Sequence, residues 1–177
     1  MAIPSRHADP SAIPQTLRTF FVTSSIAGKR NLLRSARCAN LFIEVLYHYR
    51  SERKYFLHSF VVMPDHFHVV ITMGHEITIE RAVQFIKGGF AFRAGRAFGL
   101  KPPVWQRGFS EARIYDPEHL SRVREYIARN PAKLGLAHGV RDYPYSSACG
   151  RFELDELPQG LKPSGSLPLI GTPEGVP

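Results

Sequence analysis

The stretch VVMPDHFHVVIT, residues 61–72, places two histidines one residue apart between β-branched apolar residues. Side chains of a strand alternate between its faces, so His66 and His68 project to the same side, roughly 6.6–6.8 Å apart. Two imidazole nitrogens on one face can bind the same metal ion. A pair of hydrogen-bonded, half-buried histidines without a ligand fits the same residues, so the pair alone leaves both interpretations open.

A second set of reactive residues lies in the sequence YIARNP. Tyr126 and Asn130 are four residues apart, which makes them neighbours on one face of a helix. If that helix packs over the histidine strand, it completes an ion site of His66, His68 and Asn130 with a phenol beside it. This mixture of nitrogen and oxygen ligands suits Mg²⁺ or Mn²⁺ bound to phosphate oxygens. An ordinary helix aromatic and a helix C-cap before proline are the structural alternatives for the two residues.

The chemistry that this set predicts is attack on a phosphodiester by tyrosine. A phenol has a pKa near 10, so it is a poor nucleophile at neutral pH unless a metal ion or local positive charge favours the phenolate. An ion held by the histidines would polarise the scissile phosphate and neutralise the developing charge. The phosphotyrosine product conserves the bond energy, so a freed hydroxyl can reverse the step, and the reaction is strand transfer rather than hydrolysis.

The elements that must position these residues alternate along the chain. Aromatic and β-branched residues predict three strands besides the histidine strand, and apolar steps of three and four predict three helices. We expect the last helix to begin at Pro117, after an Asp N-cap, and to end at Arg129 or Asn130, because the residue before a proline disfavours helical geometry. The predicted strands cover residues 16–26, 53–63 and 110–115, and the helices cover 35–52, 77–99 and 117–130.

This order, β-α-β-β-α-β-α, predicts an α+β fold: a ferredoxin-like split βαβ sheet of about four antiparallel strands with an added C-terminal helix that carries the tyrosine. A chain of 177 residues that is 44% hydrophobic can bury one core. We therefore predict a single domain over 16–152, between a disordered N-terminal tail, 1–15, and a Pro/Gly-rich C-terminal tail, 153–177.

The location of the protein is predicted from what the sequence lacks. It has no run of 18 apolar residues and no apolar signal segment, so we expect neither membrane insertion nor secretion. Cys38 and Cys149 have no disulfide or zinc spacing and are interpreted as reduced thiols. These features predict a cytoplasmic protein.

The net charge of the chain and its distribution predict the kind of molecule that the protein binds. A formal net charge of +8 favours a polyanion, and residues 81–110 contain no acidic residue. Aromatic residues interleave with the cations of this zone, a pattern typical of single-stranded nucleic acid binding, although buried phenylalanines and solvated cations would give the same pattern. The zone favours DNA over a small-molecule substrate. The candidate DNA-binding residues are Lys87, Arg93, Arg96, Lys101 and Arg107.

Taken together, the motifs resemble the single-tyrosine HUH transposases, and among them the REP-associated tyrosine transposases of bacteria. The resemblance spans residues 16–150. It is carried, in order, by MPDHFH, VWQRGFSEARI, YIARNPAKLGL and DYPYSS. It implies that His66 and His68 are metal ligands, that Tyr126 forms a 5′-phosphotyrosine, and that Asn130 stands where the family places a third polar ligand.

The resemblance also implies the substrate and the cofactor. The substrate would be single-stranded DNA folded into an imperfect palindromic hairpin, as in repeated extragenic palindromes, and the cofactor Mg²⁺ or Mn²⁺. The protein would be nucleoid-associated and a monomer, with a homodimer as the alternative because insertion-sequence members share active sites across a dimer.

Three other functions fit parts of the sequence. The first is a hairpin DNA-binding module that has lost turnover. A two-histidine phosphoesterase needs two H-x-T/S motifs, which HSF and HFH do not supply. An RRM-like RNA binder would present aromatic residues rather than histidines on its open sheet face. We rank these below a metal-dependent DNA nuclease and strand-transferase.

Overall fold

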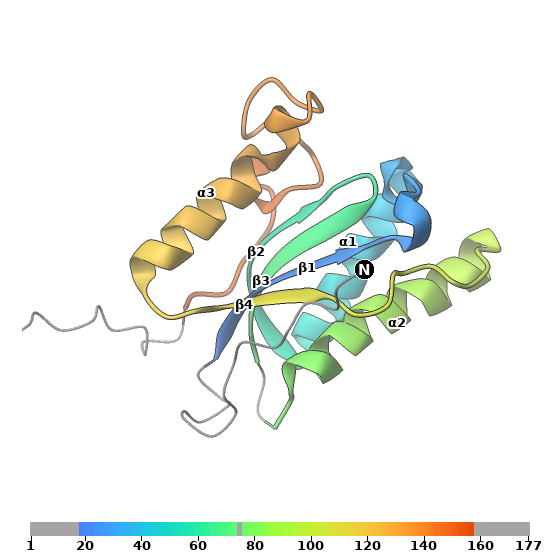
Figure 1. The fold of residues 1–177 in the computed structure, drawn as a ribbon, viewed down its shortest axis with the longest axis horizontal. Coiled ribbons are helices and arrows are strands. Elements are labelled where there is room, and N and C mark those ends of the chain that lie inside the picture. The colour runs from blue at the N-terminus through green and yellow to red at the C-terminus, as the bar shows by residue number, and fades with distance from the viewer. Residues whose placement is uncertain (1–17, 74–75, 158–177) are drawn as a thin grey trace, which may run out of the picture.

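The computed structural model describes residues 18–73 and 76–157. Four strands and three helices make up the fold (Figure 1). Short 3-10 turns follow the first strand and precede the last described segment. The elements are β1 Thr19–Ser25, α1 Ala36–Ser51, β2 Tyr55–Val62, β3 His66–Met73, α2 Ile79–Phe98, β4 Ser110–Ile114 and α3 Pro117–Lys133.

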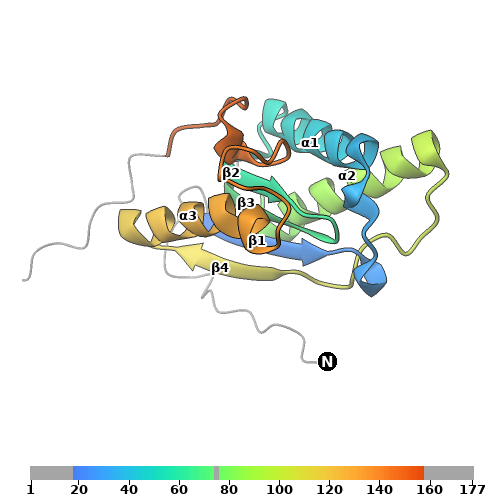
Figure 2. The same cartoon turned by 90° about the horizontal axis from the view of Figure 1, so that it is seen from above.

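The four strands form one antiparallel sheet in the order β2-β3-β1-β4. The helices α1 and α2 cover one face, and α3 covers the other (Figures 1 and 2). This arrangement confirms the predicted ferredoxin-like α+β fold with an added C-terminal helix. The register places Thr23 opposite His68 and Ser25 opposite His66. We call the side of the sheet that carries these histidines the histidine face.

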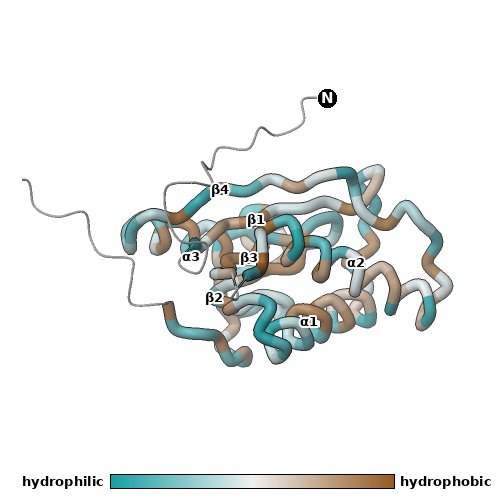
Figure 3. Tube along the Cα trace, turned by 90° about the horizontal axis from the view of Figure 1, so that it is seen from below, coloured by the Kyte–Doolittle hydropathy of each residue, from teal (hydrophilic) through white to brown (hydrophobic). Residues whose placement is uncertain are grey.

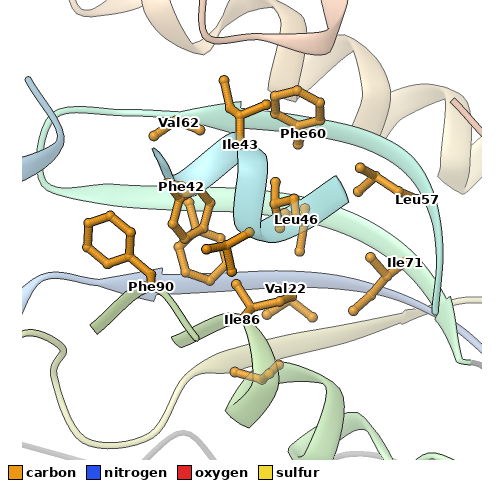
Figure 4. Close-up of a cluster of buried hydrophobic side chains, with 14 of the residues drawn as sticks. Val22, Phe42, Ile43, Leu46, Leu57, Phe60, Val62, Ile71, Ile86 and Phe90 are labelled. Carbon is orange, nitrogen blue, oxygen red and sulfur yellow. The ribbon is translucent and has the colours of Figure 1, made fainter. Parts of the chain in front are cut away.

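The larger core lies between the sheet and the two helices α1 and α2. Phe67, Val69 and Ile71, which alternate with the histidines along β3, are fully buried in it. Figure 4 shows side chains of the strands β1, β2 and β3 packed against side chains of the helices α1 and α2. Hydrophobic segments follow the central strands, whereas polar and apolar residues alternate along the helices (Figure 3). This core makes the histidine strand a rigid support.

Gly89 explains why a pair of glycines is tolerated inside α2. A Cβ atom at this position would lie 2.6 Å from the Tyr49 ring of α1. The missing side chain therefore lets the two helices approach closely, which offsets the low helix propensity of glycine.

The smaller core lies on the histidine face, beneath α3. Leu120, Val123 and Ile127 of the helix pack there with Val61 and Val70 of the sheet. Their spacing of three and four residues gives α3 one apolar stripe that holds the helix to the sheet. The residues beside this stripe are consequently placed next to the histidines.

The start of α3 is as predicted, but its end is not. Asp116 caps the helix by accepting a hydrogen bond from the His119 N–H at 2.6 Å. The helix continues through Pro131 to Lys133, so the predicted end at Arg129 or Asn130 was wrong. Pro131 stands in the last turn and is buried, so packing outweighs the one backbone hydrogen bond that it removes. Asn130 is thus inside the helix and is not its C-cap.

The first residues of the predicted C-terminal tail are docked against the sheet. Asp155 accepts two hydrogen bonds from the Arg50 guanidinium, at 2.8 and 2.9 Å, and one from the Leu57 N–H at 2.7 Å. Its own N–H donates to the Leu57 carbonyl. These bonds occupy the outer edge of β2. The remainder of this tail and the N-terminal tail lie outside the described residues.

We expect Asp155→Ala to lower the free energy of unfolding by about 2 kcal/mol, because it removes hydrogen bonds to a charged group. Burial opposes ionisation of Asp155, but its bonds to Arg50 and Leu57 outweigh it and lower its pKa. The stabilisation is therefore present above the unfolded pKa of about 3.9 and is lost as the pH falls through the lower folded value. Urea titrations of both proteins at neutral and acidic pH test this.

The matched control is Glu156→Ala, which removes a neighbouring exposed carboxylate. It should leave stability unchanged at either pH. Equal stability of wild type and Asp155→Ala at neutral pH would contradict a structural role for the docked segment.

Candidate metal and tyrosine site

Each histidine of the pair is fixed through its Nδ1 atom. The Nδ1 of His66 lies 2.6 Å from a carboxylate oxygen of Asp65, and the Nδ1 of His68 lies 2.6 Å from the Thr23 hydroxyl. The two rings are 4.8 Å apart between centroids. A carboxylate only accepts, so in the neutral ring of His66 the proton is on Nδ1 and the lone pair is on Nε2. This is the orientation that a second-shell partner gives to a metal-binding histidine.

The Nε2 atom of His68 is buried and has no hydrogen-bond partner in the described part of the chain. The residue is 4% exposed. Burial, and then the neighbouring His66, lower the pKa of His68 to about 3, so the ring is neutral at physiological pH. An unpaired buried polar atom costs roughly 1–3 kcal/mol, which makes an unsatisfied ring nitrogen at this position a mark of a ligand site.

Another buried histidine, His58, shows the contrast. His58 is fully buried in β2, yet its Nδ1 lies 2.9 Å from the Asp155 carbonyl and its Nε2 lies 2.8 Å from the Thr72 hydroxyl. Both of its nitrogens are therefore satisfied within the protein. His58 is a structural histidine, and His68 is not satisfied in the same way.

Tyr126 of α3 lies directly over the histidine strand. Its ring centroid is 5.3 Å from that of His68 and 5.9 Å from that of Phe21. Tyr126 is 41% exposed, so the residue is open to a substrate. The ammonium of Lys133 lies 5.4 Å from the Tyr126 ring centroid. The structure thus brings the predicted nucleophile beside the predicted metal ligands, together with a cation.

Asn130 lies one helical turn beyond Tyr126 and is 7% exposed. In the described ranges, no group of three or more His, Cys, Asp and Glu side chains could hold a metal ion. A site built on the histidine pair therefore has to draw on other oxygen ligands. The amide of Asn130 is a polar group on the α3 face beside Tyr126.

The sequence did not identify Thr23, Asp65, Phe21 or Lys133 as part of this site. Asp65 could have been noticed, because a carboxylate directly before a histidine is a common orienting partner. Thr23 and Phe21 could not, since only the register of β1 against β3 brings them to the histidines. Lys133 could not be predicted either, because it belongs to the site only if the helix continues beyond Pro131.

The predicted DNA-binding residues are not gathered around the histidines. They lie on α2 and the loop after it, and α2 covers the opposite face of the sheet. The Lys87 ammonium donates to the carbonyls of Gln106 and Gly108, and burial lowers its pKa to about 8. Lys87 therefore anchors a loop in this structure. Arg96, Lys101 and Arg107 are exposed, and Arg93 is half-buried.

Most aromatic residues of this zone face the core. Phe90 is fully buried, and Phe98, Trp105 and Phe109 pack against the same core. Phe92 is 65% exposed. The stacking surface predicted for this zone is consequently reduced to Phe92.

None of the helices among residues 18–73 and 76–157 is long and apolar enough to span a membrane.

Comparisons with known proteins match much of this chain and its fold. The family model described as "Transposase IS200 like" matches residues 21–130. A Haemophilus influenzae protein named "Putative REP-associated tyrosine transposase" is 29% identical over 96 residues, which cover 49% of this chain and 54% of the relative. The chain thus aligns with about half the length of that curated relative.

Two solved structures share the fold. A REP-associated tyrosine transposase bound to a REP hairpin matches 97% of this chain and 100% of its own, with a TM-score of 0.66 and 23% identity. The structure of a putative transposase from Deinococcus radiodurans matches 69% of this chain and 95% of its own, with a TM-score of 0.50 and 18% identity.

Proposed function

Because this chain belongs to the IS200-like transposase family, we propose that it cuts and rejoins single-stranded DNA at hairpin elements through a covalent bond to Tyr126. The observation that carries the proposal is the buried Nε2 of His68, which has no hydrogen-bond partner among the described residues and lies beneath the exposed Tyr126 ring. The hairpin partner is supported by the related structure that is bound to a REP hairpin.

The reaction is a transesterification at phosphorus. The Tyr126 oxygen forms a bond to the scissile phosphorus, and the bond from phosphorus to the 3′ oxygen breaks. The phenolic proton is lost to solvent, and the departing 3′ oxygen gains a proton. The products are a 5′-phosphotyrosine and a free 3′ hydroxyl, which can attack the linkage and restore a phosphodiester. No high-energy cofactor is consumed, because the phosphotyrosine stores the bond energy.

The residues present fit a divalent metal ion, Mg²⁺ or Mn²⁺. His66 and His68 would hold it through their Nε2 atoms, with the Asn130 amide as a third ligand. When bound, the ion would supply Lewis-acid polarisation of the scissile phosphate. The protein itself orients the two rings through Asp65 and Thr23. Lys133 adds positive charge beside the phenol.

The test of this function uses labelled single-stranded hairpin oligonucleotides drawn from repeats that flank the gene. They are mixed with the protein and either Mg²⁺ or Mn²⁺ and resolved on a denaturing gel. A metal-dependent covalent adduct is the expected result. Tight binding without cleavage or adduct under either metal would contradict the proposal and leave a DNA-binding module.

We expect Thr23→Val to weaken metal binding about 10- to 100-fold, the usual effect of removing a second-shell partner. Valine matches threonine in shape but leaves the Nδ1 of His68 without its hydroxyl partner. Titration with Mn²⁺, followed by electron paramagnetic resonance of the free ion, measures this affinity. Thr23→Ser keeps the hydroxyl and should bind nearly as tightly as wild type, whereas equal weakening by both substitutions would point to lost packing.

A further inference from the structure

Two segments that are distant in sequence form one cationic surface at the end of the sheet where β3 begins. The first follows β1, and the second comprises the end of α2 and the loop after it; Figures 1 and 2 show them at the same end of the molecule. We call this the cationic end surface. It comprises the exposed residues Lys29, Arg30, Arg34, Arg37, Arg96, Lys101 and Arg107.

Direct contacts join the two segments. The Arg30 guanidinium donates to the Pro103 carbonyl at 2.6 Å, and the Ala27 N–H donates to the Val104 carbonyl at 2.9 Å. The guanidinium carbon of Arg37 lies 4.6 Å from the Phe98 ring centroid. The cations of both segments therefore belong to one surface.

This surface reaches the histidine site. The Lys29 ammonium lies 4.0 Å from one oxygen of Asp65, and the other oxygen of Asp65 lies 2.6 Å from the Nδ1 of His66. The Gln106 N–H donates to the Ser25 carbonyl, and Ser25 is the strand partner of His66. A chain of phosphates on the cationic end surface would thus lead directly to the histidines.

The charge of the surface is unbalanced. Residues 18–43 and 81–110, which supply all seven cations, contain no aspartate or glutamate. Arg34 and Lys101 are exposed and make no ion pair with the described residues. Exposed cations that are not paired with a carboxylate, such as Arg34 and Lys101, are typical of a surface that neutralises phosphates.

We propose that the cationic end surface binds the backbone of the single strand that adjoins the scissile phosphate, and not the hairpin stem. This inference rests on the proposed function and names the part of the substrate that guides the strand to the histidines. The exposed Phe92, with the Arg96 guanidinium 5.8 Å from its ring centroid, offers a stacking face for an unpaired base on the same helix.

The test compares two double variants by fluorescence anisotropy over a range of salt concentrations. Arg34→Gln with Lys101→Gln removes two cations of the surface, and Arg53→Gln with Arg81→Gln removes two exposed cations outside it, after α1 and in the first turn of α2. Each protein is titrated with a hairpin that carries a single-stranded flank and with the same stem without a flank.

For the flanked hairpin, we expect the surface variant to lower the magnitude of the slope of log affinity against log salt by about 1.4, which is about 0.7 for each lost contact to a single strand. This change makes binding about tenfold weaker near physiological salt. The control variant and the stem without a flank should show little change. Three results would overturn the inference: equal loss by both variants, equal loss for both DNAs, or no loss.

Adduct formation by wild type and by the control variant separates this inference from the proposed function. Both proteins are expected to form the adduct in equal yield, because the control substitutions lie outside the surface and leave the histidines and Tyr126 in place. If wild type forms an adduct but the slopes do not differ, the surface assignment alone fails. If wild type neither binds nor cleaves DNA, the proposed function fails and the inference fails with it.

Discussion

Tyr126→Phe is expected to reduce formation of the covalent DNA adduct by at least about 10⁴-fold, since the substitution removes the attacking oxygen and leaves the ring in place. The ring keeps its contacts with His68 and Phe21, so the fold and DNA affinity should be preserved. Denaturing gels measure the adduct, and anisotropy with the flanked hairpin measures binding.

The matched control is Tyr115→Phe. Tyr115 is also exposed, at 59%, and lies just before α3, but it is not in contact with the histidine pair. This variant should form the adduct at the wild-type rate. If Tyr115→Phe lost the adduct and Tyr126→Phe kept it, the nucleophile would be Tyr115 and not Tyr126.

The second large effect is expected from His68→Ala, which should reduce the rate of adduct formation by about 10³-fold, because a bound metal ion supplies several kcal/mol of charge stabilisation. The Nε2 of His68 is a buried atom without a hydrogen-bond partner in the described residues, so the substitution removes the expected ligand and no internal hydrogen bond at that atom. Metal affinity should fall in parallel, and Mn²⁺ titration measures it.

His138→Ala serves as the control, since it removes an exposed histidine from the segment after α3. It should bind Mn²⁺ and form the adduct as wild type does. If His68→Ala kept full metal affinity and full activity, the histidine pair would not be the metal site, whatever the role of Tyr126.

Much of the fold could be predicted from local patterns. The alternation of residues along β3 was enough to assign Phe67, Val69 and Ile71 to one core and the histidines to the other face, because a strand has a period of two. The end of α3 could not be predicted. The rule that a helix stops before proline is local, whereas the burial of Pro131 that overrides it depends on tertiary packing.

The candidate site was likewise predictable only in part. Tyr126 and Asn130 follow from helical spacing, and His66 and His68 from strand spacing, but their meeting depends on α3 packing on the histidine face. The orienting role of Thr23 depends on strand register, which the sequence does not specify.

The charged residues show the same limit. Grouping them by sequence included Lys87, which anchors a loop, and omitted Arg37, whose guanidinium the fold brings over the Phe98 ring at the end of α2. Proximity in sequence was therefore an incomplete guide to a surface that two distant segments share.

The measurement that tests the central claim most directly is mass spectrometry of the trapped adduct. After incubation of wild-type protein with the flanked hairpin and Mn²⁺, the protein is digested with protease and the DNA with nuclease, and the modified peptide is sequenced. A 5′-phosphonucleotide on Tyr126 is the predicted result. A nucleotide on any other residue, or cleavage of the DNA with no nucleotide retained on the protein, would contradict a Tyr126-linked intermediate.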